Sequence, residues 1–150
     1  MTPYELAGRY GGVKELAGEK HHPLIQWWLS LCFDGNLDLP DETPWCSAFV
    51  NGIAWEFRLD RSKSARARSW LKHGKPIGLT FARPDADIVV LRRGSGAGAQ
   101  GADVLDAPGH VGWFAGVEGG KVLVRGGNQG DAVTVATFPL EAVLGVRRLT

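Results

Sequence analysis

The sequence has 150 residues, of which 44% are hydrophobic and 22% charged, and this balance predicts one globular domain over residues 1–150 rather than a disordered chain. The formal net charge of +1 gives no broad basic face and no nucleic-acid-binding motif is present, so we expect no nucleic-acid partner. No stretch approaches the length of a membrane span, and residues 1–6 lack the basic and apolar regions of a signal peptide, so we expect synthesis in the cytoplasm.

Helices are predicted in the first half of the chain, where apolar residues recur at helical spacing. The third helix is the most informative, because Thr43 is a favoured N-cap, Pro44 suits the first helical position and Cys46 follows as the third residue. Cys46, Val50 and Ala54 share one face of this helix, which should therefore be buried. The predicted helices cover residues 4–16 with a break at Gly11 and Gly12, 23–32, 43–57 and 64–72.

Strands are predicted in the second half, because short runs of β-branched and aromatic residues are separated there by turn residues. The run Glu118-Gly119-Gly120-Lys121 predicts a hairpin turn. Helices followed by strands form an α+β pattern, and we expect an antiparallel sheet packed on the helix that carries Cys46. The predicted strands cover residues 87–91, 110–117, 121–125, 133–138 and 143–148.

A glycine-rich segment, residues 93–102, separates the first two predicted strands. It is too rich in glycine to hold one conformation unaided. A dinucleotide-binding loop is disfavoured, because no helix-forming stretch follows the segment before Pro108. We expect a mobile loop that flanks a substrate groove.

Cys46 is the strongest candidate for a catalytic residue. A thiol in the first turn of a helix feels the positive end of the helix dipole, which favours the nucleophilic thiolate. The carboxyl groups of Asp41 and Glu42 oppose this effect if they lie close to the thiol. Cys32 lies in an apolar stretch without these features and should be a core thiol, and a reducing compartment argues against a disulfide between the two cysteines.

A cysteine nucleophile needs a base, and His110 is the best candidate among the four histidines. His110 opens a predicted strand on which Gly112 shares its face, and a glycine there leaves room for a helix end or a substrate. We therefore expect Gly112 to lie next to bound substrate. His21 and His22 precede a proline at a helix start, where a surface or capping role is the default. His73 precedes a glycine at a helix end, where a cation suits the helix dipole.

The third member of such a site holds the imidazole by accepting its second N–H. The predicted hairpin pairs the His110 strand with a return strand that runs into Gly126-Gly127-Asn128-Gln129. Asn128 should therefore reach the same end of the sheet as His110, and it is the predicted orienting residue. Gln129 beside it is a predicted substrate-binding residue. Alternatively, this segment only forms a turn between two strands.

Four segments in this order resemble small papain-like peptidoglycan hydrolases. They are Pro44-Trp45-Cys46-Ser47-Ala48-Phe49-Val50, Asp87-Ile88-Val89-Val90, Gly109-His110-Val111-Gly112 and Gly126-Gly127-Asn128-Gln129. The sequence looks like the NlpC-type and CHAP-type cysteine peptidases, and most of all a phage-associated subgroup, from about residue 3 to the C-terminus. The resemblance implies a papain-like α+β fold with Cys46 as nucleophile, His110 as base and Asn128 as orienting residue.

Trp45 and Gly126 depart from the commonest patterns of these families. Trp45 stands where many NlpC-type enzymes have Asp or Gln, and Gly126 stands where many CHAP-type enzymes have an acidic residue. Because Trp45 adjoins the nucleophile, we expect it to line the cleft and to stack on a sugar or peptide of the substrate.

These features together predict a cysteine peptidase or amidase that cleaves an amide bond of the peptidoglycan stem peptide, without a metal or another cofactor. The expected role is that of a phage endolysin, a tail-associated lysin or a delivered effector. One alternative is a papain-like domain that binds the wall or a partner without turnover. Another is a zinc hydrolase, although the sequence has no H-E-x-x-H or paired-cysteine spacing.

A cell-wall substrate lies outside the compartment in which this chain is expected to be made. We therefore expect delivery to the wall or periplasm by a holin, a phage tail or a secretion apparatus, with an immunity or delivery protein as a further partner. The cations between residues 58 and 68 suit a solvated connecting segment, or alternatively a weak attraction to an anionic wall polymer.

Overall fold

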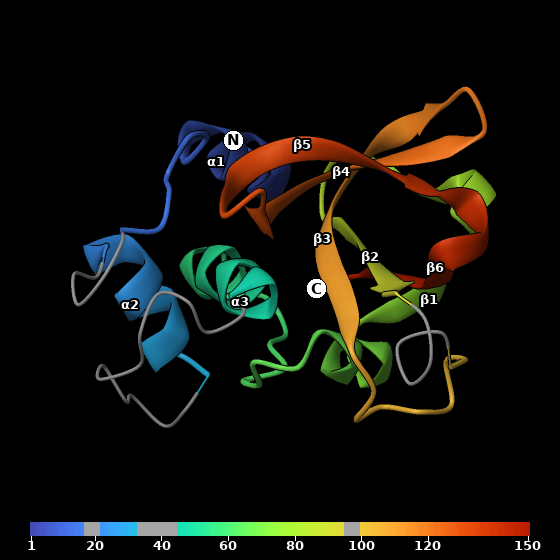
Figure 1. Ribbon diagram of the computed structural model, residues 1–150, viewed down its shortest axis with the longest axis horizontal. Helices are drawn as coiled ribbons and strands as arrows, with labels where there is room; N and C mark the ends of the chain where they lie inside the picture. Colours follow the sequence, from blue (N-terminus) through green and yellow to red (C-terminus); the bar gives the residue numbers. More distant parts are fainter. Residues whose placement is uncertain (17–21, 33–44, 95–99) are drawn as a thin grey trace.

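The body of the fold is an antiparallel sheet whose strands lie in the order β1-β6-β2-β3-β4-β5. The computed structural model describes residues 1–16, 22–32, 45–94 and 100–150, and within these residues the sheet has six strands. Figure 1 shows that β4 and β5 curve strongly at one side of the sheet. The strands are β1 (Lys75–Ile77), β2 (Asp87–Arg92), β3 (Gly109–Glu118), β4 (Lys121–Gln129), β5 (Ala132–Pro139) and β6 (Val143–Arg148).

Helix α3 (Cys46–Glu56) lies between the sheet and helix α2 (Pro23–Ser30), as Figure 1 shows. It packs on β3 and β4, and its residues from Cys46 to Ala54 are all buried, as expected for a helix covered on both sides. The indoles of Trp28 and Trp113 belong to the apolar layer around it. The other described helical elements are α1 (Pro3–Arg9) and the 3₁₀ helices η1 (Ala67–Lys72), η2 (Leu79–Phe81) and η4 (Leu140–Ala142).

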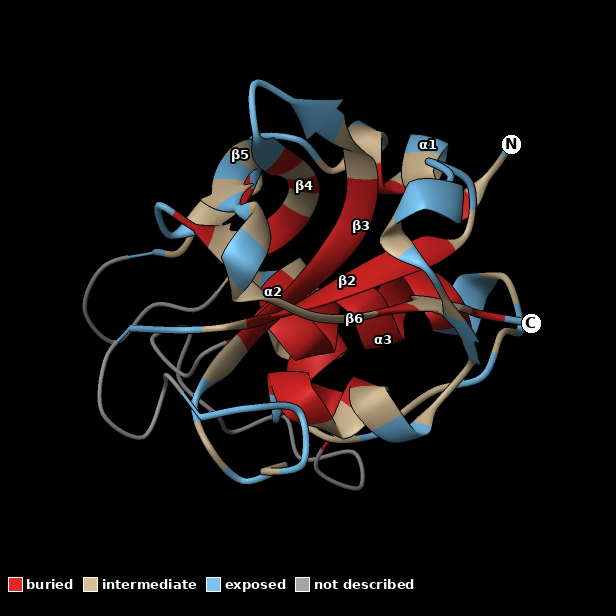
Figure 2. Ribbon diagram, turned by 90° about the vertical axis from the view of Figure 1, so that its right-hand side faces the viewer, coloured by how far each residue is buried: buried red, intermediate tan, exposed pale blue. Residues whose placement is uncertain are grey.

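The opposite face of the sheet holds a second apolar cluster. Phe138 on β5 and Leu140 on η4 pack against this cluster and help to cover it. Figure 2 shows that burial follows β2, β3, β4 and α3, whereas the hairpin between β3 and β4 is exposed. The predicted α+β architecture, with an antiparallel sheet on the Cys46 helix, is confirmed. The buried members of the second cluster are Val89, Leu91, Phe114, Val122, Val124 and Val146.

The first predicted helix is shorter in the structure. α1 ends at Arg9, and Gly12, with a φ of 86°, turns the chain so that Lys14 bridges to Ala132 at the start of β5. The segment predicted to continue the helix therefore pairs with the sheet. The helix predicted over residues 64–72 is the short 3₁₀ helix η1.

The five predicted strands are present, and β4 continues beyond its predicted end at Arg125 as far as Gln129. The sequence did not predict β1, which pairs with β6 at the edge of the sheet. Pro76 lies in β1, and an edge strand tolerates proline because one side of it need not donate hydrogen bonds. None of the described helices is long and apolar enough to cross a membrane.

Candidate active site

Cys46 is the first residue of α3, so its thiol lies at the positive end of the helix dipole. Trp45 occupies the N-cap position and makes no side-chain capping bond. The predicted capping residues Thr43 and Pro44 lie outside the described residues. Cys46 is thus closer to the helix start than the sequence predicted.

The Cys46 thiol forms a hydrogen bond with His110, and the backbone N–H groups of Ser47 and Val111 also donate to the sulfur. Burial of the thiol opposes its ionisation. The hydrogen bond and charge of His110, together with the two N–H donors, outweigh burial, and the pKa of Cys46 is lowered. A thiol with a lowered pKa beside an imidazole is the arrangement of an activated cysteine nucleophile.

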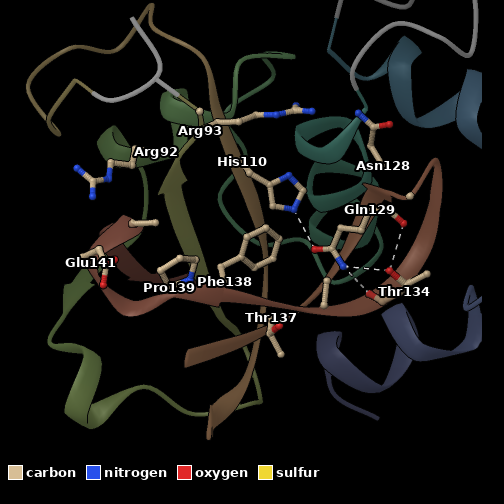
Figure 3. Close-up of a pocket in the computed structure, with 14 residues that line it drawn as sticks. Arg92, Arg93, His110, Asn128, Gln129, Thr134, Thr137, Phe138, Pro139 and Glu141 are labelled. Atoms are coloured by element: carbon tan, nitrogen blue, oxygen red, sulfur yellow. Dashed lines mark hydrogen bonds between the residues drawn. The ribbon is translucent and has the colours of Figure 1, made fainter. Parts of the chain in front are cut away.

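The imidazole of His110, near the start of β3, lies between the thiol and Gln129. Its Nε2 is 2.9 Å from Oε1 of Gln129 (Figure 3). Nδ1 is therefore the nitrogen that remains for the thiol. Burial opposes protonation of the ring, but the hydrogen bonds to Cys46 and Gln129 and the thiolate charge outweigh it, and the pKa of His110 is raised. The positive charge of Arg93 acts in the opposite direction. The two pKa shifts together favour a thiolate and imidazolium pair.

The amide of Gln129 fixes the tautomer of the imidazole. Nε2 of Gln129 donates to the backbone oxygens of Val124 and Thr134, at 3.2 and 2.9 Å, so its oxygen is the end that faces His110. An amide oxygen only accepts hydrogen bonds, and therefore Nε2 of His110 carries a proton. In the neutral ring, Nδ1 is then the unprotonated nitrogen, as a general base acting on the thiol requires.

A β-bulge explains why Gln129 rather than Asn128 reaches His110. Between its pairings at Gly126 and Gln129, β4 has one residue more than the facing segment of β5. The extra residue reverses the alternation of side chains, so Gln129 takes the face that a regular strand would give to Asn128. Asn128 has a φ of 58° and lines a groove beside the site, and Figure 3 shows no hydrogen bond between its amide and the imidazole. The orienting contact predicted for Asn128 is made by Gln129.

We expect Gln129→Ala to lower kcat by about 10- to 100-fold, because a hydrogen bond to a charged group contributes about 1.5 to 3 kcal/mol. Asn128→Gly is the matched control, since glycine accepts the positive φ at this position without steric cost. It should lower kcat less than Gln129→Ala does. Steady-state kinetics on one peptide substrate measure both effects, and a larger loss in Asn128→Gly would return the orienting role to Asn128.

Two glycines of β4 allow the catalytic residues and the start of α3 to pack closely against this strand. A Cβ on Gly126 would lie 2.7 Å from Oε1 of Gln129 and 3.5 Å from Nε2 of His110, so a side chain there would displace the Gln129 amide. A Cβ on Gly127 would lie 2.5 Å from the ring of Trp45. The glycine pair therefore allows close approach of the His110 and Gln129 contact on one face and of the start of α3 on the other.

The substrate contacts predicted for Trp45 and Gly112 do not fit the structure. Trp45 is fully buried, stacks on Trp28 with ring centroids 5.9 Å apart, and donates its Nε1–H to Glu15 over 2.7 Å. Gly112 is also buried, and a side chain there would collide with Val124 on β4. The large apolar indole packs inward beneath the nucleophile, and Gly112 serves the packing between strands rather than access for a substrate.

A groove of ≈ 830 Å³ opens beside His110 and Gln129, between the ends of β2, β4 and β5 and the short helix η4 (Figure 3). Phe138 on β5 packs against the imidazole, with ring centroids 5.2 Å apart. Cys46 is not among the described lining residues and is 2% exposed. The groove therefore borders the imidazole of His110, and Cys46 lies behind it.

The predicted glycine-rich loop begins at this groove. Arg93 and Gly94 are among the lining residues, whereas residues 95–99 lie outside the described residues. On the β2 side the groove is therefore bordered by Arg93 and Gly94, the first two residues of this segment, and the prediction of a mobile loop falls mainly on residues outside the described ones.

A buried arginine fixes the segment that leads into His110. Arg68 on η1 is fully buried, although the sequence placed it among the solvated cations of residues 58–68. Its guanidinium donates hydrogen bonds of 2.8 to 3.0 Å to four backbone oxygens ahead of β3, and this anchors the approach to the catalytic strand. The acceptors belong to Gln100, Gly101, Val104 and Pro108.

Two other histidines have structural roles. Nδ1 of His22 accepts the N–H of Leu24 at the start of α2, and the ring of His73 lies 3.1 Å from the carboxylate of Asp60. His21 lies outside the described residues. In the part of the chain that the structure describes, no three His, Cys, Asp or Glu side chains form a group that could hold a metal ion.

No family model and no curated protein matches the sequence. Among solved structures, the chain is similar to NlpC1 from Trichomonas vaginalis, with a TM-score of 0.58 and 20% identity over 99% of this chain and 43% of that one. It is also similar to NlpC2 from the same organism, with a TM-score of 0.56 and 18% identity over 99% and 45% of the two chains. The chain spans less than half the length of these two proteins. The likeness shows that it has the papain-like α+β fold of the NlpC proteins.

Proposed function

We propose that this protein is a peptidoglycan hydrolase that cleaves an amide bond of the stem peptide through a cysteine nucleophile. The observation that carries the proposal is the chain of hydrogen bonds from the Cys46 thiol through His110 to Gln129, with a groove beside it. The NlpC-type fold and the four sequence motifs support the choice of peptidoglycan as substrate.

The reaction begins when the Cys46 thiolate attacks the carbonyl carbon of the amide. The C–N bond breaks as Nδ1–H of His110 protonates the leaving nitrogen, which gives a thioester and a free amine. Water then gives a proton to Nδ1 and attacks the thioester, which releases a carboxylic acid and regenerates the thiol. Gln129 holds the ring in position during both steps.

The backbone N–H of Cys46 is the proposed oxyanion donor. It belongs to the first turn of α3, where backbone N–H groups have no acceptor within the helix. The next N–H, that of Ser47, donates to the Cys46 sulfur instead. The helix start thus serves both the nucleophile and the developing negative charge.

We further propose that the enzyme acts on the wall after delivery by a holin, a phage tail or a secretion apparatus. The phage-associated subgroup that the motifs resemble supports a role as an endolysin or a tail-associated lysin. An immunity or delivery protein is a further proposed partner. Infection or secretion assays with the tagged chain would show whether it reaches the wall.

A second candidate is a papain-like domain that binds the wall or a partner without turnover. The 2% exposure of Cys46 favours it, because a nucleophile must be reached by its substrate. Retention of the protein on intact wall polymer, without release of fragments, would support this candidate.

Digestion of purified peptidoglycan, followed by mass spectrometry of the released fragments, tests the proposed hydrolase. Cleavage within the stem peptide identifies an endopeptidase, and release of whole stem peptides from the sugar identifies an amidase. EDTA should leave the rate unchanged, because the proposed steps use no metal. A rate that EDTA abolishes and zinc restores would instead support the zinc hydrolase.

Iodoacetamide should label Cys46 faster than Cys32. The two residues are 2% and 8% exposed, so the difference comes from ionisation and not from exposure. Burial raises the pKa of Cys32 to about 12, whereas the pKa of Cys46 is lowered. Peptide mapping after timed labelling measures both rates, and a bound muropeptide should slow the labelling of Cys46. Faster labelling of Cys32 would contradict the assigned nucleophile.

A further inference from the structure

Two guanidinium groups border the groove on its β2 side. Arg92 is the last residue of β2, Arg93 follows it, and both line the groove together with His110. In Figure 3 the side chain of Arg93 extends past the imidazole, whereas Arg92 points toward the side of Glu141. The proposed acyl transfer from a neutral amide uses neither cation.

The charges of these arginines are not neutralised within the described part of the chain. Neither side chain has an ion pair or a hydrogen bond with a described residue. Glu141 is the one acidic side chain among the described residues that line the groove, and it is exposed. Arg93 lies close enough to His110 for its charge to lower the pKa of that ring. The β2 wall therefore carries a positive potential beside the reacting groups.

The opposite wall of the groove is largely uncharged. Ala136, Phe138 and Pro139 of β5 and Ala142 of η4 supply apolar surface there. A ligand with one anionic group would therefore bind in one direction, with its negative charge toward β2 and its apolar parts toward β5.

We propose that Arg93, assisted by Arg92, binds a free carboxylate of the peptide substrate, so that the enzyme selects stem peptides with a free acid near the scissile amide. This inference rests on the proposed hydrolase function. A guanidinium can bind both oxygens of a carboxylate at once, and such charge-assisted bonds are stronger than neutral ones. Stem peptides carry carboxylates on side chains and at the C-terminus, and either one could bind at this wall.

Matched stem peptides test the preference. One peptide has free carboxylates, a second has its side-chain carboxylates converted to carboxamides, and a third has only its C-terminus converted. The wild-type enzyme should cleave the free acid with a kcat/KM about 10- to 100-fold above that of one of the two amides, mainly through a lower KM. The amide that is poorly cleaved shows which carboxylate Arg93 binds.

Variants test whether the arginines cause the preference. Arg93→Gln should bring the ratio of kcat/KM for the acid to kcat/KM for the amide close to 1, and Arg92→Gln should lower this ratio less. Arg93→Lys should give an intermediate ratio, because lysine keeps the positive charge but cannot bind both carboxylate oxygens with paired N–H groups. Arg66→Gln is the matched control, because it removes the same positive charge at an exposed position that does not line the groove. It should keep the wild-type ratio.

The outcomes separate this inference from the proposed function. Equal cleavage of all three peptides by the wild-type enzyme would overturn the carboxylate site and leave the hydrolase proposal standing. An unchanged ratio in Arg93→Gln would also overturn it. If no peptide is cleaved, the hydrolase proposal fails, and the Kd of each peptide measured by calorimetry tests the carboxylate site by itself. A lower Kd for the free acid supports the site, and equal Kd values overturn it.

Discussion

Cys46→Ala should abolish cleavage of peptidoglycan, with a loss of at least about 10³-fold in kcat, because no other group can form the thioester. The fold should persist, since alanine favours a helix and leaves only a small space at the start of α3. Fragment release measured by mass spectrometry gives the activity, and a thermal unfolding curve gives the stability. If Cys46→Ala cleaves peptidoglycan at the wild-type rate, the proposed cysteine mechanism is wrong.

Cys32→Ala is the matched control for this experiment. Its thiol donates toward the backbone oxygen of Trp28 and accepts from Asn51, inside the helical layer and away from the groove. The variant should keep catalysis and lose stability, by about 1 kcal/mol for weak buried contacts and a small cavity. Loss of activity in a well-folded Cys32→Ala would contradict the assignment of Cys32 as a core thiol without a catalytic role.

His110→Ala should lower kcat by at least about 10²-fold, the lower range for a lost general acid–base group. It should also change the pH profile. In the wild-type enzyme, activity should rise as Cys46 ionises below its ordinary pKa and fall as His110 loses its proton above its ordinary pKa. Without His110 the thiolate loses its main stabilising partner, so the rising limb should move to higher pH and the falling limb should disappear.

His73→Ala is the control for His110. His73 pairs with Asp60 at the end of η1 and does not line the groove, so its loss should leave kcat and both limbs of the pH profile in place. A pH profile of His110→Ala with the same two limbs as the wild type would show that another group titrates in catalysis.

Cys46 and His110 could be predicted from the sequence because each carries a local signal, and the family resemblance implies that they share one site. Helical spacing places Cys46 on the buried side of its helix, and the Gly119-Gly120 turn fixes which strands pair. The order of helices and strands then leaves one sheet face for the helix to cover. The helix and the hairpin depend on residues close together in the chain, and the structure contains both.

The residues that the sequence misplaced depend on contacts between distant segments. Gln129 replaces Asn128 because of one extra residue in β4, and a bulge of this kind is defined only against its partner strand. The sequence predicted Arg68 to be a solvated cation, because its four backbone acceptors lie more than thirty residues further along the chain. Arg92 and Arg93 matter only because β2 ends at the groove.

Trp45 shows how the reactive groups are tied to the hydrophobic interior. Its ring packs between Trp28 on α2 and Gly127 on β4, and its Nε1–H donates to Glu15, which follows α1. The residue before the nucleophile and the strand that carries Gln129 are thus joined by one rigid indole. Fraying of the start of α3 would therefore also disrupt the packing of Trp45 in the core. The distance between Cys46 and Gln129 thus depends on the same contacts that stabilise the fold.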